Sequence, residues 1–161
     1  MQADPATREA AFKDLVDYPY DIAAAAKIIE EQGVKGQEIV ITAAPVGNNF
    51  AVIAHATAAA AESIGLKAKI NTVTPNAYTT LFSDPEARKG TDLYYINWYL
   101  SMGDPQEMFS VLCTGEFANY GSWSNSDFDK AANGGIQTMD RQERYTKSVE
   151  AQKILNAEEP C

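Results

Sequence analysis

Four side chains suited to holding a solute lie between positions 98 and 104: Trp98, Ser101, Met102 and Asp104. The tryptophan offers a large rigid ring with one polar atom, which can press on a ligand at little entropic cost. The serine and aspartate offer hydrogen-bonding oxygens, and the thioether of Met102 adapts to irregular apolar shapes. The set predicts noncovalent binding. The alternatives are a core position for Trp98, a gap-filling role for Met102, and for Asp104 a helix cap before Pro105.

An apolar segment precedes these residues and is expected to position them. Residues 93–100 are rich in aromatic side chains and contain a single asparagine, and they lie between turn residues at 90–92 and 103–105. A short apolar segment bounded by turns predicts a strand, here over 92–99, that is buried on both faces. Ligands bind at the carboxyl ends of strands in open α/β sheets, so we expect residues 98–104 to lie at a ligand-binding edge.

A second group of candidate ligand-binding residues lies in the polar, aromatic stretch 114–124. It contains Asn119, Tyr120 and Trp123, and we expect it to return near the same edge of the sheet. Loops on a rigid frame often carry binding groups. The alternative is a loop fastened to the core by its aromatic rings.

The sequence contains no arrangement of residues that predicts catalysis. His55 is the only histidine and falls within an alanine-rich helix, where a surface or hydrogen-bonded core position is expected. A nucleophile elbow and a close pair of acids in a loop are both absent from the sequence. Residues 45–49 follow a predicted strand but match neither dinucleotide nor P-loop patterns. We therefore predict a protein that is not an enzyme and has no metal and no cofactor.

Composition excludes several other classes of protein. The 161 residues carry a net charge of -9, and only four of the 13 basic residues are arginine, which argues against nucleic-acid binding. Hydrophobic residues make up 45% and charged residues 22%, as in one globular domain or a large piece of one. The amino terminus does not read as a signal peptide. Cys113 and Cys161 could pair with each other, or each could be free or partnered elsewhere.

Strands and helices alternate along the first two thirds of the chain. Capping residues, Gly and Pro stops and hydrophobic periodicity predict strands at 38–43, 66–73 and 92–99 and helices at 4–16, 21–32, 50–64, 76–82, 106–112, from Asn125 or Ser126 to about 132, and 141–157. The helix 50–64 is expected to bury Ile53, Ala56, Ala60 and Ile64, and the pair Gly134-Gly135 is expected to interrupt the helix that starts near 126.

This order predicts an α/β fold with a short, mostly parallel sheet flanked by helices and joined by right-handed crossovers. We expect residues 1–161 to form a single lobe, with an amino-terminal helical segment at 1–19 and a carboxyl-terminal helix at 140–160.

Several short motifs follow one another along the chain in a characteristic order. Tyr20-Asp21 precedes Ala-Lys-Ile-Ile-Glu-Glu-Gln-Gly, and a helix ends in Ser-Ile-Gly-Leu-Lys-Ala-Lys at 63–69. Trp98 then leads through Gly103-Asp104-Pro105, Asn119 and the 123–129 segment Trp-Ser-Asn-Ser-Asp-Phe-Asp to Asp140-Arg141, Tyr145, Ala151-Gln152 and Glu158-Glu159-Pro160. Over residues 18–160 this combination resembles the family 5 extracellular solute-binding proteins, the oligopeptide, dipeptide and nickel receptors of ABC importers.

The resemblance implies one lobe of a type II periplasmic-binding-protein-like fold, a fragment from the carboxyl side of a larger two-lobe receptor. It implies as partners a small solute or short peptide, the other lobe of the same receptor and an ABC permease. It also implies an extracytoplasmic location, either periplasmic or as a cell-surface lipoprotein. In the family a cleft tryptophan stands at the position of Trp98.

At the position of Ser101, peptide-binding members of the family carry an aspartate that clamps the α-ammonium group of the peptide. A serine cannot neutralise that charge, and charge-assisted hydrogen bonds are about twice as strong as neutral ones. The sequence therefore predicts a receptor that does not read a free peptide amino terminus at this position.

Two other functions stay open from the sequence. One is an effector-sensing domain of a regulator on a similar two-lobe fold, which would be joined to a DNA-binding helix pair. The other is a small α/β enzyme, for which only Asp104 qualifies as an acid or base near the edge.

Overall fold

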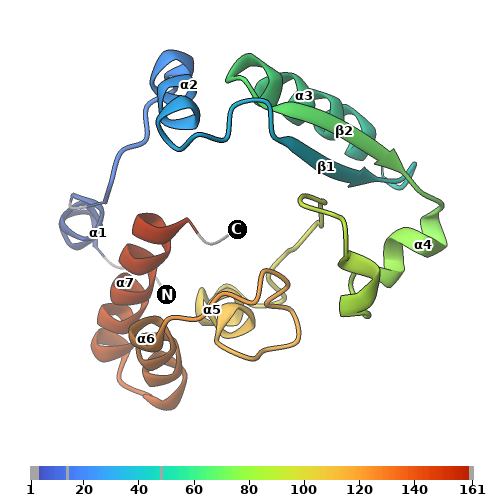
Figure 1. The fold of residues 1–161 in the computed structure, drawn as a ribbon. Coiled ribbons are helices and arrows are strands. Elements are labelled where there is room, and N and C mark those ends of the chain that lie inside the picture. Colours follow the sequence, from blue (N-terminus) through green and yellow to red (C-terminus); the bar gives the residue numbers. More distant parts are fainter. Residues whose placement is uncertain (1–3, 14, 48, 160–161) are drawn as a thin grey trace. The chain divides into compact units, whose positions relative to one another are not determined.

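The structure is a computed structural model that describes residues 4–13, 15–47 and 49–159. The chain divides into two compact units, one of residues 19–97 and one of residues 1–18 and 98–161. The elements, labelled in Figure 1, are α1 Pro5–Phe12, α2 Ile22–Glu31, β1 Glu38–Ala43, α3 Phe50–Ser63, β2 Lys67–Thr72, α4 Pro75–Thr80, the 3₁₀ turn η1 Pro85–Arg88, α5 Gln106–Leu112, α6 Ser126–Gln137 and α7 Arg141–Glu158.

Side-chain capping sets the start of several helices where the sequence predicts it. Asp4, Asp21 and Asp140 each accept a hydrogen bond from the backbone N–H three residues ahead. These bonds satisfy amide groups that have no partner within the first turn of a helix. The capped helix α1 ends at Phe12, earlier than the predicted end at 16.

The 19–97 unit is built on a parallel pair of strands. β1 and β2 run side by side from Glu38 opposite Lys67 to Ala43 opposite Thr72, and α3 connects them. Alternate residues of β1, among them Ile41 and Ala43, pack with Ala54 and Ala58 of α3. The predicted α/β class and parallel pairing are confirmed.

The buried face of α3 differs from the predicted one. Phe50, Ala54, Ala58 and Ala61 are buried, whereas Ile53 is 37% exposed. The buried set recurs every three or four residues, and its alanines allow the helix to lie close against the sheet. Alanines occur on every side of this helix, so apolar periodicity did not single out one face.

The prediction of a buried strand over 92–99 is wrong. Leu93 alone forms a parallel bridge, with Ile41, and Leu93, Ile96 and Trp98 are each about 40% exposed. In a continued ladder Tyr95 would be the next residue to exchange backbone hydrogen bonds with β1.

The hydroxyl of Tyr78, instead of the backbone of β1, bonds to the backbone of Tyr95. It accepts from the backbone N–H of Tyr95 at 2.8 Å and donates to the carbonyl of Tyr95 at 2.7 Å. Tyr78 is 1% exposed, and burial raises the pKa of its phenol, so the hydroxyl keeps the proton that it donates. A buried side chain from α4 therefore ends the sheet after Leu93.

The core of the other unit lies among α5, α6 and α7. Phe109 and Phe128 meet edge to face at 6.1 Å between ring centroids, and Trp123 packs on Phe128 at 4.8 Å. Ala132 of α6 and Ala151 of α7 are fully buried beside these rings. The helix α7 thus covers a small aromatic core.

The glycine pair does not interrupt α6, which continues through it to Gln137. A Cβ atom built on Gly135 would lie 2.1 Å from Nε2 of Gln106, a side chain that is itself 2% exposed. On Gly134 the nearest atom would be Cδ of Lys147 at 3.3 Å. Gly135 is therefore needed for the close approach of α5. The general tendency of glycine to interrupt helices does not reveal this role.

The two glycines provide a matched pair of variants. Gly135→Ala should destabilise the unit by about 1–3 kcal/mol through overpacking against Gln106. Gly134→Ala should be neutral or stabilise by up to about 1 kcal/mol, because alanine favours helix and the lysine stem can move. Urea unfolding followed by tryptophan fluorescence reports on this unit, since it contains both Trp98 and Trp123. Equal midpoints for the two variants would contradict the close-approach role.

Candidate functional site

The first group of predicted ligand-binding residues lies on an open segment. Trp98 is 41% exposed and Met102 is 64% exposed, and Ser101 is exposed as well. These residues lie just before α5 in the chain. Aromatic, hydroxyl and thioether groups are thus presented to solvent, as the binding interpretation requires.

Glu107 of α5, which the sequence analysis did not single out, holds this segment. Its Oε1 accepts from the backbone N–H of Ser101 at 2.9 Å and from the Ser101 hydroxyl at 2.7 Å. Its Oε2 accepts from the backbone N–H of Met102 at 2.9 Å. The sequence signal was weak, because an acidic residue in the first turn of a helix is expected for helical reasons alone.

Both carboxylate oxygens of Asp104 have partners within the protein. Oδ1 accepts from the backbone N–H of Gln106 at 3.0 Å, and Oδ2 forms an ion pair with Nη2 of Arg144 at 2.6 Å. Both side chains of the pair are 26% exposed, so solvent screens it only in part. Asp104 therefore bonds to the first amide of α5 and ties the start of this helix to α7.

The second group, in the loop after α5, is held together from inside. Asn119 is 8% exposed; its Nδ2 donates to the carbonyls of Leu112, Cys113 and Trp123, and its Oδ1 accepts from the backbone N–H of Trp123. Nε1 of Trp123 donates to Oε2 of Glu158 at 2.8 Å. Both residues therefore fasten the loop to the core.

Tyr120, the third member of this group, is half-buried. Its ring meets that of Phe117 edge to face, with centroids 6.5 Å apart.

The two groups thus have different surroundings in the described residues. The structure joins Ser101, Met102 and Asp104 to α5 and α7, and it joins Asn119 and Trp123 to the core beneath their own loop. Only the first group presents several side chains to solvent next to an anchored carboxylate.

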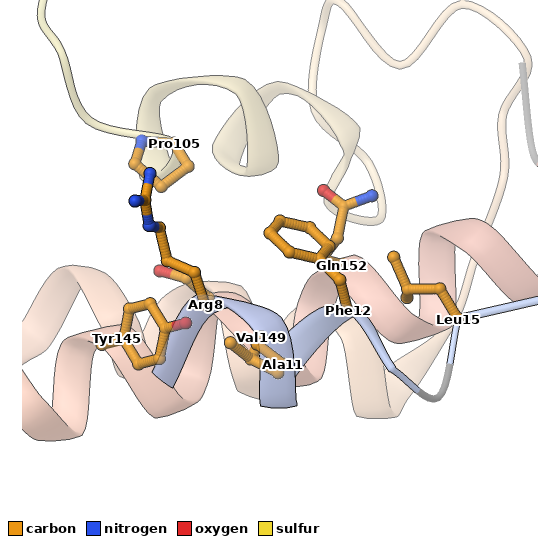
Figure 2. A pocket seen from close by; sticks show the side chains of 9 residues that line it. Arg8, Ala11, Phe12, Leu15, Pro105, Tyr145, Val149 and Gln152 are labelled. Atoms are coloured by element: carbon orange, nitrogen blue, oxygen red, sulfur yellow. The ribbon is translucent and has the colours of Figure 1, made fainter. Parts of the chain in front are cut away.

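A groove of about 240 Å³ lies elsewhere in the same unit (Figure 2). Its lining comes from the α1 segment, α7 and the start of α5, and consists of Arg8, Ala11, Phe12, Leu15, Pro105, Tyr145, Ser148, Val149 and Gln152. The hydroxyl of Tyr145 donates to the carbonyl of Thr7, which holds α1 beside α7. None of the predicted ligand-binding residues lines this groove.

Cys113 has no disulfide partner within the described residues. Its side chain is buried, and Cys161, the other cysteine of the pairing that the sequence leaves open, lies outside the described residues. No three His, Cys, Asp or Glu side chains of the described part converge to hold a metal ion. Within the same part, none of the helices has the length and apolar character needed to span a bilayer.

The sequence profile of the bacterial extracellular solute-binding proteins, family 5 Middle, matches residues 2–120. This match covers α1 to α5 and the loop to Tyr120, including the exposed segment at 98–104. The chain belongs to this family. The resemblance inferred from motifs over 18–160 is confirmed, and the family is one of binding proteins. No curated protein sequence gives a significant match.

Solved structures show that this family 5 chain has the fold of type II periplasmic binding proteins. The Helicobacter pylori protein DppA, in complex with the peptide STSA, matches with a TM-score of 0.78 and 19% identity over 91% of this chain and 29% of its own. A Pseudoalteromonas dipeptide-binding protein in complex with Met-Leu matches with a TM-score of 0.78 and 24% sequence identity. The match covers 93% of this chain and 31% of that protein.

Staphylococcus aureus NikA, in complex with Ni(L-His)₂, gives a TM-score of 0.76 and 19% identity over 90% of this chain and 32% of its own. The predicted fold class is therefore confirmed. The chain spans about 30% of the length of these relatives.

The environment of Cys113 predicts an unreactive thiol. Burial, together with the carboxylates of Asp129 and Glu116, raises its pKa to about 11. At pH 8 the thiol therefore stays protonated, and the thiolate is the form that reacts. In a Cys161→Ser variant we expect Cys113 to react with a disulfide reagent at least about 100-fold more slowly in the native state than in urea. Equal rates at pH 8 would show that the thiol is accessible and ionised.

The hydrogen bonds of Asn119 predict a large cost for its removal. Asn119→Ala removes the side-chain donor to the part-buried carbonyls of Leu112 and Trp123 and the acceptor of the Trp123 N–H, and we expect a loss of about 2–4 kcal/mol in the free energy of unfolding. Asn133→Ala on the exposed side of α6 is the control and should change it by less than about 0.5 kcal/mol. Urea unfolding followed by tryptophan fluorescence measures both, and similar values for the two variants would refute the fastening role.

Proposed function

We propose that residues 1–161 form one lobe of a two-lobe receptor that delivers a peptide or peptide-like solute to an ABC importer. Membership of the family 5 solute-binding proteins is the observation that carries this proposal. The peptide and dipeptide complexes of two structural relatives support a peptide-like ligand. The chain itself performs no reaction in this proposal, and the permease and the other lobe are its partners.

The proposed location is extracytoplasmic, either periplasmic or at the cell surface as a lipoprotein. The description of the family as extracellular supports this placement. A receptor that supplies an importer has to meet its solute on the outer side of the membrane.

We propose Trp98, Ser101, Met102 and Tyr120 as the side chains of this lobe that contact the solute. The exposure of the first three supports this choice. In this proposal Asp104, Asn119 and Trp123 have a supporting role, because Asp104 ties α5 to α7 and the other two fasten the loop after α5.

Capture by two lobes requires that the closed form binds the solute better than the open form does. Each lobe supplies part of the contact surface, and closure about a hinge buries the ligand between them. A single lobe then offers only part of the binding free energy. This reasoning predicts weak binding, or none, by the isolated 161 residues.

The proposal is tested with the protein expressed from the complete reading frame that contains these residues. Native mass spectrometry against defined dipeptides, tripeptides and tetrapeptides identifies bound solute, and calorimetry measures its Kd. Trp98→Ala should weaken binding about 30-fold, a loss of about 2 kcal/mol typical of a buried aromatic anchor. Tyr20→Ala removes another exposed ring, 91% exposed, and should leave Kd unchanged.

Two outcomes would overturn the proposal. One is a receptor that binds none of these peptides. The other is micromolar or tighter peptide binding by the isolated 161 residues with no effect of Trp98→Ala, which would place the whole site elsewhere in this chain.

A further inference from the structure

We propose that Glu107 is the positioning residue of the solute-binding segment 98–104, where it fixes the Ser101–Met102 turn and makes the Ser101 hydroxyl a hydrogen-bond acceptor. The solute group that meets Ser101 is then a hydrogen-bond donor. This inference rests on the proposed function for its ligand, but the positioning role can be measured on the protein alone.

The geometry of the carboxylate carries the first step. Both oxygens of Glu107 are used, Oε1 by the amide and hydroxyl of Ser101 and Oε2 by the amide of Met102, at distances of 2.7–2.9 Å. Two consecutive backbone amides are therefore held by one side chain. Hydrogen bonds to an ionised acceptor are stronger than neutral ones, so a single residue can order an otherwise exposed turn.

The helix that carries Glu107 is itself fixed. Gln106 lies against Gly135 of α6, and its Nε2 donates to Oγ of Ser148 on α7 at 2.8 Å. Asp104 adds the ion pair with Arg144, also on α7. The carboxylate thus projects from a base that is tied to two other helices, which is the arrangement that accurate positioning needs.

The direction of the hydroxyl bond gives the chemical consequence. A serine hydroxyl has one proton and two lone pairs. Its proton is donated to Glu107, so an incoming group meets lone pairs on the exposed side of Ser101. A solute N–H or ammonium group fits there, whereas a carbonyl or carboxylate would find no proton to accept.

The ionisation of Glu107 agrees with this reading. Its pKa is lowered by the bond from the Ser101 amide, then by the bond from the Ser101 hydroxyl and by the bond from the Met102 amide. The carboxylate is therefore charged at neutral pH and brings a negative charge to the Ser101 position. Ser101 itself is neutral, so any negative charge that a solute ammonium group meets at this position comes from Glu107.

The first arm of the test uses amide hydrogen exchange by NMR on the 161-residue chain. Glutamine has one acceptor oxygen where glutamate has two, so in Glu107→Gln at least one of the Ser101 and Met102 amides should exchange at least tenfold faster. The Tm, measured by thermal unfolding followed by circular dichroism, should stay within about 2 °C of the wild-type value. Ser101→Ala removes only the hydroxyl and should leave the Met102 amide slow. Glu116→Gln, an exposed acid, is the control.

The second arm measures the Kd of the complete receptor for the peptide found by native mass spectrometry. Glu107→Gln and Ser101→Ala should each weaken binding at least tenfold, while Glu116→Gln should not. Unchanged exchange at both amides overturns the positioning role whatever the receptor binds. Faster exchange with wild-type affinity overturns the role of Ser101 as acceptor but leaves the receptor function intact. Faster exchange in a protein that binds no peptide overturns the proposed function and leaves the positioning role standing.

Discussion

The arrangement of the exposed segment 98–104 depends on how closely α5 approaches its two neighbouring helices. Gln106 is buried where α6 carries a glycine, and it bonds to Ser148 of α7. Without that approach neither the Asp104–Arg144 pair nor the Glu107 carboxylate would have a fixed base. The absence of a single Cβ atom therefore affects residues that lie far away in the chain.

Local signals in the sequence were enough for most element boundaries. β1 and α5 have the predicted bounds, and α2, β2 and α7 differ from prediction by a residue or two. Helix caps and glycine stops act within a few residues, so a single sequence contains their physics. The errors arose where distant residues decide the outcome. The Tyr78 hydroxyl ends the sheet. The contact with Gln106 explains why Gly135 lies within α6, where a glycine pair alone predicts an interruption of the helix.

In the candidate site, too, the sequence predicts local features but not contacts between distant residues. Residue type and order pointed to the 98–104 segment, and three of its four candidates are exposed there. The sequence could not separate Asp104 and Asn119, whose polar atoms are used within the protein, from residues that face solvent. Glu107 was missed because its importance comes from a turn that folds back onto it. Family membership supports the proposed role of the exposed segment in solute binding.

The contact between Tyr78 and Tyr95 also bears on self-association. An unpaired strand edge offers a row of amide and carbonyl groups that can template another chain. Beyond Leu93, the backbone groups of Tyr95 that would continue the pairing with β1 are occupied by a phenol from the same unit. Because the phenol occupies both groups, they are not available to a strand of another chain, and residues 94–97 stay outside the ladder.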